Sequence, residues 1–579
     1  MSTEYTNPYG VSSFKNFNKL NRAFVDKTEF INVIDKLDTP YPVLLRPRRF
    51  GKTTFVQMLD CFYDISYKDD YDEIFKGTKI IEKNLPSHNT YHVIDFEFSN
   101  ISGKTSEQLV ESFSKNVLNS IKLFLDKYKE VDFDVEQHRK DPPGDLIDAF
   151  FTSCKIAFKG NQDLYVIIDE YDNFANEILS KNRDLFKAIT NADGFLKAFY
   201  KAIKKHTNTV VAKTFITGVS SVSLDSLTSG FNIAKNVTCD PRLNEFAGFT
   251  KDELIGLIEK LVDTKALNTT AENIAEIMRQ AYNGYAFCPE AKHTLFNTSM
   301  CLNYIDYISL KKTIENPERV LDPACAFDKS KVADIISFTP KNVLKLVASE
   351  FETTGEIVIS ELAQSINLNQ LEQYDLQTSL SVLYYLGYLT IKNDGVGSGI
   401  CLTYPNKMMK YMFELCFINA LIPKIEDDDN CIFDITSMLR GNPDLKGFID
   451  SVTEYLSLRI TNQHLLGFNE NTIKVLVRAK LEDLKMLAVN TEQKLTVPMV
   501  GEKFADLVVD NQKGTYYLFE FKYFSKAKAQ QHPNILQEKI AEAKEQINCY
   551  KTAVEFEGKT VFSYIAIFES INCVHFERL

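Results

Sequence analysis

Short apolar runs alternate with amphipathic stretches along the first 250 residues. Four such runs lie at residues 41–45, 92–99, 164–172 and 210–221, and they are rich in strand-forming residues. Apolar runs of this length, separated by helical segments, are typical of buried parallel strands in α/β proteins. The pattern therefore predicts an α/β domain built on a parallel sheet.

The first run leads into a basic, glycine-containing loop, RPRRFGKTT, at residues 46–54. Gly51, Lys52 and Thr53 fit the end of a Walker phosphate-binding loop, although Arg46 stands where its first glycine belongs. Backbone amides of such a loop cradle phosphate, the lysine reaches the β- and γ-phosphates, and the threonine binds Mg²⁺. The alternative is a Gly-Lys-Thr that follows a strand by chance. The residues expected to bind ATP are Arg49, Phe50, Gly51, Lys52, Thr53, Thr54 and Asp169.

Two adjacent acids, Asp169 and Glu170, end the third run. After a phosphate-binding loop, such a strand places Asp169 beside the metal of the nucleotide and lets Glu170 act as the general base. An ordinary strand followed by a polar loop is the alternative. Thr217 or Ser220, at the end of the fourth run, is positioned to sense the γ-phosphate, or is a plain turn residue.

The same blocks of sequence carry a family resemblance. FVDKTEFI, RPRRFGKTT, IIDEYDN, FITGVSSVSL, FAGFTKDEL and YNGYAF resemble successive segments of the AAA-ATPase-like family, whose phosphate loop reads R-P-R-R-F-G-K. The resemblance implies a P-loop ASCE/AAA-like ATPase core at residues 1–248 and a helical lid at 249–345. It also implies a C-terminal PD-(D/E)XK nuclease domain, to which the family's ATPase is commonly fused. AAA-like cores often form rings, so a homo-oligomer is possible.

Helical periodicity dominates the middle of the chain. Residues 250–262 carry one apolar stripe, and Thr250 with Glu253 forms a capping box at its start. Residues 346–425 are expected to form a winged-helix-like module of helix, helix, two-stranded wing and helix. Its second helix has few basic residues, so a connecting or docking role is favoured over reading DNA. An acidic run at 426–430 is expected to be a linker.

The C-terminal residues 431–579 carry the second candidate site. Glu520 and Lys522 are two residues apart on one predicted strand and therefore share a face. A hairpin through residues 511–514 can bring Asp506 beside them. Two carboxylates in such a place hold Mg²⁺ or Mn²⁺, and a neighbouring lysine can position or deprotonate the water that attacks a phosphodiester.

The predicted order of helix, three strands, helix and strand resembles the PD-(D/E)XK core. By this resemblance Glu470 is a further metal-binding acid on the first helix, and Gln546 with Tyr550 is an accessory pair on the later helix. A surface hairpin of alternating charge is one alternative. A retained nuclease fold with an inactive site is another.

Composition and charge bear on the partners and the cellular location that we expect. The chain has 579 residues and a net charge of −12, which argues against wholesale coating of nucleic acid but leaves room for a local basic groove. Eleven scattered cysteines favour free thiols. No signal pattern or 18-residue apolar run is present, so we expect a cytoplasmic protein, the nucleus not excluded, without a membrane span.

Three functions remain open at this stage. The first is an ATP-controlled, metal-dependent nuclease acting on DNA or RNA, with Glu170, Glu520 and Lys522 as its catalytic residues. The second is a nucleotide-switched module that binds nucleic acid or protein through an inactive nuclease fold. The third is an interaction protein that neither hydrolyses ATP nor cuts.

Overall fold

The chain divides into two compact units. The structure, a computed structural model, describes residues 5–11, 13–173, 194–221, 230–317, 320, 350–351, 354–363, 376–392, 399–413, 438, 445–459, 469–482 and 487–579. Described residues up to 410 belong to the first unit, and those from 411 onward belong to the second.

A five-stranded parallel sheet forms the centre of the first unit, in the order β2-β3-β4-β1-β5. Its strands are β1 (Pro42–Leu45), β2 (His92–Glu97), β3 (Leu164–Asp169), β4 (Val211–Gly218) and β5 (Lys235–Asn236). The predicted parallel sheet is confirmed. Because β4 lies between β1 and β3, the loops that follow β1 and β3 meet at one edge of the sheet on either side of β4.

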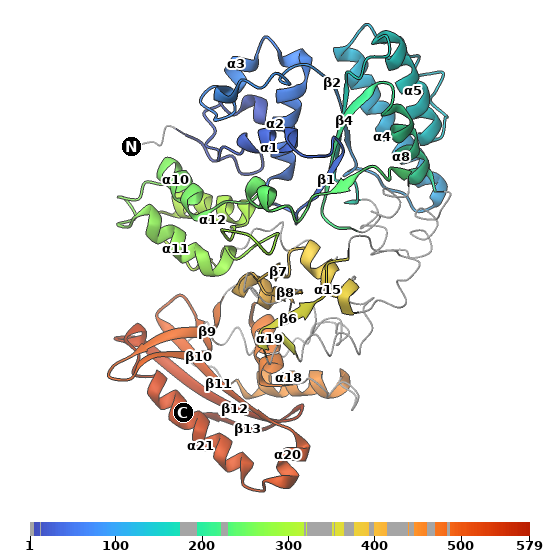
Figure 1. Cartoon of the computed structure of the whole chain (residues 1–579). Helices are drawn as coiled ribbons and strands as arrows, with labels where there is room; N and C mark the ends of the chain where they lie inside the picture. Colours follow the sequence, from blue (N-terminus) through green and yellow to red (C-terminus); the bar gives the residue numbers. More distant parts are fainter. Residues whose placement is uncertain are drawn as a thin grey trace. The chain divides into compact units, whose positions relative to one another are not determined.

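Helices cover both faces of this sheet. Figure 1 shows α2 on one side and α5 with α8 on the other. The helices of this part are α1 (Glu29–Asp35), α2 (Lys52–Tyr63), α3 (Tyr71–Ile74), α4 (Ser106–Lys127), α5 (Pro143–Ala157) and α8 (Phe195–His206). α2 begins directly after the phosphate loop, so its first turn lies where the loop needs free backbone amides.

Three further helices follow the sheet: α10 (Lys251–Leu261), α11 (Ala271–Tyr282) and α12 (Thr298–Lys311). The capping box of Thr250 and Glu253 is present, as predicted. The apolar stripe of α10 is buried as the periodicity required, and it consists of Leu254, Leu257, Ile258 and Leu261. Burial of this stripe holds α10 against its neighbours α11 and α12.

The middle segment differs from its prediction at one end. It contains β6 (Glu356–Ile359), α15 (Leu376–Tyr385), β7 (Thr390–Ile391) and β8 (Ile400–Thr403), with the sheet order β6-β8-β7. The first helix was expected where β6 lies. Ile357 and Ile359 are buried whereas Val358 is 56% exposed, so the alternation has the period of a strand. Most of the expected glycine-rich wing tip lies outside the described residues.

The second unit contains a mixed sheet in the order β13-β12-β11-β10-β9. Only β11 and β12 pair in parallel, and the other neighbours are antiparallel. The strands are β9 (Ala488–Val497), β10 (Gly501–Asp510), β11 (Thr515–Phe524), β12 (Thr560–Glu569) and β13 (Asn572–Arg578). β13 lies beyond the predicted order of helix, three strands, helix and strand, and β9 ends at Val497, because residues 498–500 form the turn to β10.

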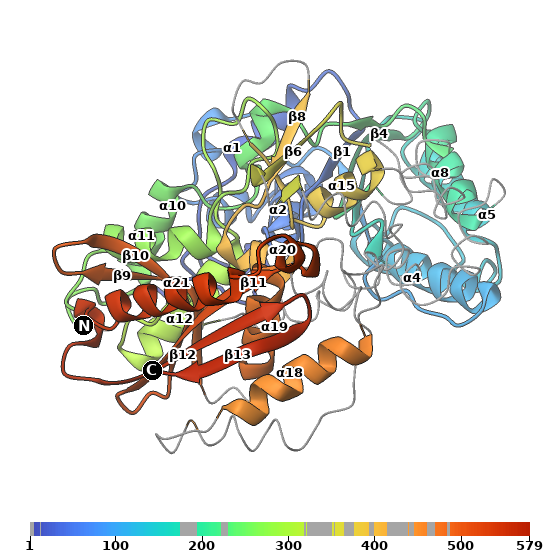
Figure 2. The same ribbon diagram turned by 90° about the horizontal axis from the view of Figure 1, so that it is seen from below.

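Each face of this sheet has its own core. α18 (Lys446–Arg459) and α19 (Glu470–Glu482) supply buried residues on one face, and α21 (Ile535–Tyr550) on the other. Figure 2 shows α21 running along the sheet, with the short α20 (Lys526–Gln531) before it.

The acidic run at 426–430 lies outside the described residues. Within the described chain, no helix combines the length and the apolar character that crossing a membrane requires.

Candidate functional site

The lysine of the phosphate loop is hydrogen-bonded to carbonyl oxygens of the same loop. Gly51 caps α2 with a φ of 90°, a conformation that costs glycine little. The Lys52 ammonium donates hydrogen bonds of 3.0 Å to the carbonyl oxygens of Arg46 and Pro47. Burial lowers the pKa of Lys52, while the nearby acids Glu170 and Asp169 raise it. Phosphate oxygens arriving in the loop would replace these carbonyls as acceptors.

The acid pair after β3 is placed beside this lysine. Asp169 is buried, and burial raises its pKa to about 6, although Lys52 and a hydrogen bond from Thr53 act in the opposite direction. Glu170 adopts a left-handed φ of 53° and lines the cavity described next. Thr53 and Asp169 thus lie together, as a nucleotide-bound Mg²⁺ would need.

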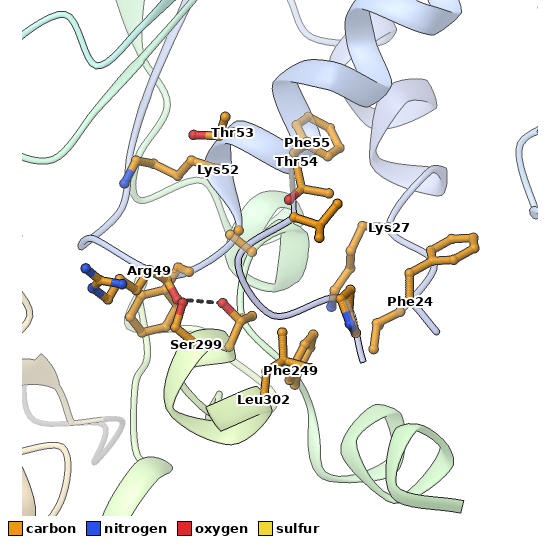
Figure 3. A pocket seen from close by; sticks show the side chains of 18 of the residues that line it. Phe24, Lys27, Arg49, Lys52, Thr53, Thr54, Phe55, Phe249, Ser299 and Leu302 are labelled. Atoms are coloured by element: carbon orange, nitrogen blue, oxygen red, sulfur yellow. Dashed lines mark hydrogen bonds between the residues drawn. The ribbon is translucent and has the colours of Figure 1, made fainter. Parts of the chain in front are cut away.

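A cavity of about 500 Å³ opens over the loop, within the usual range for small-molecule sites. Figure 3 shows Lys52 and Thr53 at one end, and Lys27 with Phe24 at the other. The predicted loop residues Arg49, Phe50, Gly51, Lys52, Thr53 and Thr54 all line it. Lys27 is held by Glu253 of α10, with both carboxylate oxygens 2.7 Å from its ammonium. Sequence reasoning missed Lys27, because its partner lies 226 positions away.

The lid contacts the loop directly. The hydroxyl of Thr298 and the amide of Ser299, at the start of α12, both donate to the carbonyl oxygen of Arg49. Phe50 is 1% exposed and meets Tyr285 edge-on, with ring centroids 4.8 Å apart. Phe50 therefore joins the loop to the lid in addition to lining the cavity.

The side chain of Arg46 is buried and hydrogen-bonded to the backbone of three segments. Its guanidinium donates to the carbonyl oxygens of Leu45 (2.8 Å), Thr238 (2.9 Å) and Leu243 (2.7 Å), and it lies over the ring of Phe287. The side chain is 1% exposed. The residue that departs from the Walker pattern thus connects the loop to the segment after β5 and to Phe287, which follows α11.

Thr217, one of the two candidates for the sensing role, is hydrogen-bonded within the sheet. Its hydroxyl donates to the carbonyl oxygen of Leu44 in β1 at 2.8 Å, so its only hydroxyl proton is already committed. A sensor of a γ-phosphate must donate to it. Ser220 is likewise turned inward, because its hydroxyl donates to Asp172, which also accepts the amides of Val219 and Ser220.

In the second unit, β10 and β11 separate where the candidate metal site begins. Their pairing ends at Leu507 opposite Phe519. Beyond this point Asp506 replaces the missing ladder bond, because its Oδ2 accepts the amide of Phe521 at 2.8 Å. The Lys522 ammonium lies 2.8 Å from Oε1 of Glu520. The fork brings Asp506, Glu520 and Lys522 to one place.

The electrostatics of Glu520 reflect this crowding. Burial and then the charge of Asp506 raise its pKa to about 7, although Lys522 lowers it. Burial lowers the pKa of Lys522, but Glu520, Glu470 and Asp506 together raise it above its usual value. Lys522 is therefore an ammonium at neutral pH.

Two of the candidate site residues have a buried oxygen atom without a hydrogen-bond donor. Glu520 Oε2 and Gln546 Oε1 are both buried and lack a donor. Tyr550 lies on the same helix as Gln546, and burial together with Glu520 and Asp506 raises its pKa. An unsatisfied buried carboxylate oxygen is costly unless a cation or donor reaches it.

Lys474 is a further member of the site that sequence reasoning missed. Its ammonium lies 2.5 Å from Asp506 Oδ1 and 3.3 Å from Glu470 Oε1. Burial lowers its pKa, but Asp506 and Glu470 raise it above the usual value. The spacing of four residues from Glu470 on one helix was a readable signal for this ion pair.

Glu470 does not join Asp506 and Glu520 in an assembled metal site here. In the described part of the chain, no three His, Cys, Asp or Glu side chains are placed to hold a metal together. Instead, the ammonium of Lys474 lies within ion-pair distance of both Glu470 and Asp506. Asp506 and Glu520, with its unsatisfied oxygen, remain suitable donors for a hard cation.

Comparisons with known proteins identify a similar sequence, a similar structure and a matching family model. A protein of Azotobacter chroococcum mcd 1, described as an uncharacterized protein in the vnfD 5' region, is 22% identical over 440 residues, which are 72% of this chain and 70% of that protein. The Walker-type ATPase paby2304 of Pyrococcus abyssi is similar to 67% of this chain over 94% of its own length, with 12% identity and a TM-score of 0.35. The family model of the AAA-ATPase-like proteins, described as predicted AAA-ATPase, matches residues 8–228, the part that holds the phosphate loop and the acid pair, and this match supports ATP binding there.

Proposed function

We propose that this chain is an ATPase coupled to a metal-dependent nuclease of the PD-(D/E)XK type, acting on phosphodiester bonds of DNA or RNA. The observation that carries the nuclease part is the fork of β10 and β11, where Asp506, Glu520 and Lys522 meet and where Glu520 keeps an unsatisfied buried oxygen.

In the ATPase part, Lys52 leaves the carbonyls of Arg46 and Pro47 and binds the β- and γ-phosphates. Thr53 and Asp169 would hold the Mg²⁺ that accompanies the nucleotide. Glu170, which faces the cavity, orients the attacking water and accepts its proton. The lid contacts at Arg49 and Phe50 provide the route by which the loop's rearrangement reaches α12 and the segment after α11.

In the nuclease part, the amide of Phe521 orients Asp506, and Glu520 projects from the neighbouring strand. A divalent cation bound by these two carboxylates would polarise the scissile phosphate and stabilise the leaving oxygen. Because the pKa of Lys522 is raised, we assign this lysine to positioning the water and balancing charge, and not to removing the proton. Gln546 and Tyr550 border the same site from α21.

The middle segment is proposed as a winged-helix-like connector. α15 carries no lysine or arginine, so a role in reading DNA is disfavoured. Instead, Gly387 lies against the phosphate loop, where an added Cβ would come within 2.8 Å of Pro47. The hydroxyl of Thr390 accepts the amide of Ala286 from the lid. This segment therefore contacts both moving parts of the proposed ATPase.

The test is cleavage of single- and double-stranded DNA and RNA with Mg²⁺ or Mn²⁺, alongside ATP hydrolysis. Lys522→Ala should abolish cleavage and leave ATP hydrolysis intact. Lys513→Ala, which removes the same charge from the exposed turn between β10 and β11, should leave both activities intact. Cleavage by Lys522→Ala at the wild-type rate would refute the proposed site.

A second candidate function is nucleotide-switched binding by an inactive nuclease fold. The observation that favours it is the ion pairing of Asp506 and Glu470 with Lys474, which leaves no assembled three-acid metal site in the described residues. It predicts ATP-dependent association with nucleic acid or protein, and no cutting with either metal.

A further inference from the structure

The ammonium of Lys474 is the positive charge nearest to Asp506 among the ion pairs of the described residues. It lies 2.5 Å from Asp506 Oδ1 and 3.3 Å from Glu470 Oε1. The other oxygen of Asp506, Oδ2, is already occupied, because it accepts a hydrogen bond of 2.8 Å from the amide of Phe521. The oxygen that faces Lys474 is thus the one left for a metal.

Lys474 and Lys522 form ion pairs with different acids of the site. Lys522 pairs with Oε1 of Glu520 at 2.8 Å, and Lys474 pairs with Asp506 and Glu470. Oε2 of Glu520 is buried and has no donor. Glu520 Oε2 therefore remains available for a cation, whereas Asp506 Oδ1 is already paired with the ammonium of Lys474.

We propose that Lys474 is a resident cation that keeps the acids of this site together without a metal and that a divalent ion must displace from Asp506. This inference rests on the proposed metal site of the nuclease. Lys474 is thus a positioning residue that sets the metal affinity, and it is distinct from Lys522, which remains beside Glu520 when the metal arrives.

The physical basis is competition for one oxygen. An ammonium in contact with a partly buried carboxylate is screened less than a surface pair, so moving it costs a divalent ion part of its binding free energy. Without Lys474, Asp506 and Glu520 would repel one another in the free protein, and a divalent ion would relieve that repulsion. Both effects lower the metal affinity of the natural chain relative to a variant without this charge.

The test is a titration of the full chain with Mn²⁺, without nucleotide, in which the electron paramagnetic resonance signal of free Mn²⁺ is measured. Lys474→Met should bind Mn²⁺ about tenfold more tightly than the natural chain, or more. Lys474→Arg keeps the charge and should bind like the natural chain. Lys503→Met removes a lysine from the exposed part of β10 and is the matched control, expected to leave the affinity unchanged.

The gain in Mn²⁺ affinity must also disappear when the proposed ligand Asp506 is removed. The double variant Lys474→Met with Asp506→Asn should lose the gain. Equal affinities of Lys474→Met and the natural chain would overturn the inference, and so would an equal gain in Lys503→Met. If Lys474→Met folds poorly, the rise in its unfolding temperature on adding Mn²⁺, which should exceed that of the natural chain, gives the same comparison.

These outcomes are separate from those of the nuclease proposal. A gain in Mn²⁺ affinity without any cleavage would support the competition and contradict the nuclease. Cleavage that depends on Lys522, with no effect of Lys474 on Mn²⁺ binding, would support the nuclease and contradict the competition.

Discussion

Replacing Arg46 by glycine would restore the usual Walker pattern, and we expect it to destabilise the first unit. In the structure the guanidinium is buried and donates to three carbonyl oxygens, those of Leu45, Thr238 and Leu243. Two of these carbonyls belong to segments nearly two hundred positions away. Glycine would leave them without a donor and would leave the space over Phe287 empty.

The magnitude follows from two opposing effects. Each hydrogen bond from a charged donor contributes about 1.5 to 3 kcal/mol, so three give roughly 5 to 9 kcal/mol. Against this, burial lowers the pKa of Arg46 from 12.5 to about 10, and relief of that desolvation returns roughly 3 kcal/mol. The net loss in the free energy of unfolding is therefore roughly 2 to 6 kcal/mol.

The assay is urea unfolding of the full chain followed by far-ultraviolet circular dichroism, with ATP binding measured by calorimetry. Arg46→Gly should lower the urea midpoint of the first unit's transition and weaken ATP binding. Arg48→Gly makes the same change in the same loop, at a residue bonded to the side chain of Asn173, and should have a much smaller effect. A natural-like midpoint for Arg46→Gly, or an equal loss in Arg48→Gly, would refute this reasoning.

Three further predictions concern the loop and the two acid sites. Gly387→Ala should cost roughly 1 to 2 kcal/mol of unfolding free energy, since φ is +83° and the new methyl would meet Pro47; an unchanged midpoint in urea would contradict this. The folded protein holds the proton of Glu520 more tightly than the unfolded chain, because the pKa rises from 4.5 to about 7; its contribution to stability is therefore full below pH 4.5 and is lost as the pH rises through 7. In the absence of metal, the unfolding free energy of the second unit should therefore decrease less between pH 4.5 and 7 in Glu520→Gln than in the natural chain. An unchanged pH profile would count against the raised pKa of Glu520. Glu170→Gln should slow ATP hydrolysis at least a hundredfold while ATP still binds, and a natural rate of hydrolysis would exclude Glu170 as the base.

Features that depend on local pattern could be predicted from the sequence. The stripe of α10 and its capping box are encoded within a dozen residues, and the structure has both. The turn between β10 and β11 was likewise readable, with Gly514 at a φ of 86°. The parallel sheet followed from short apolar runs because buried strands leave that pattern.

Features that depend on partners distant in the sequence could not be predicted. Arg46 looked like a departure from a motif, since its acceptors are brought near only by the fold. The hydroxyl of Thr217, a candidate sensor, donates to the carbonyl oxygen of Leu44, in a strand 173 positions earlier. Lys474 lies within reach of sequence reasoning through Glu470, but its contact with Asp506 requires knowing that α19 packs beside the fork.

The most direct test of the central claim is a crystal structure grown with Mn²⁺, in which anomalous scattering locates the metal. The account predicts a peak in contact with both Asp506 and Glu520, with Lys474 moved away from Asp506. A peak elsewhere in the second unit, or none between these two carboxylates at saturating Mn²⁺, would contradict it.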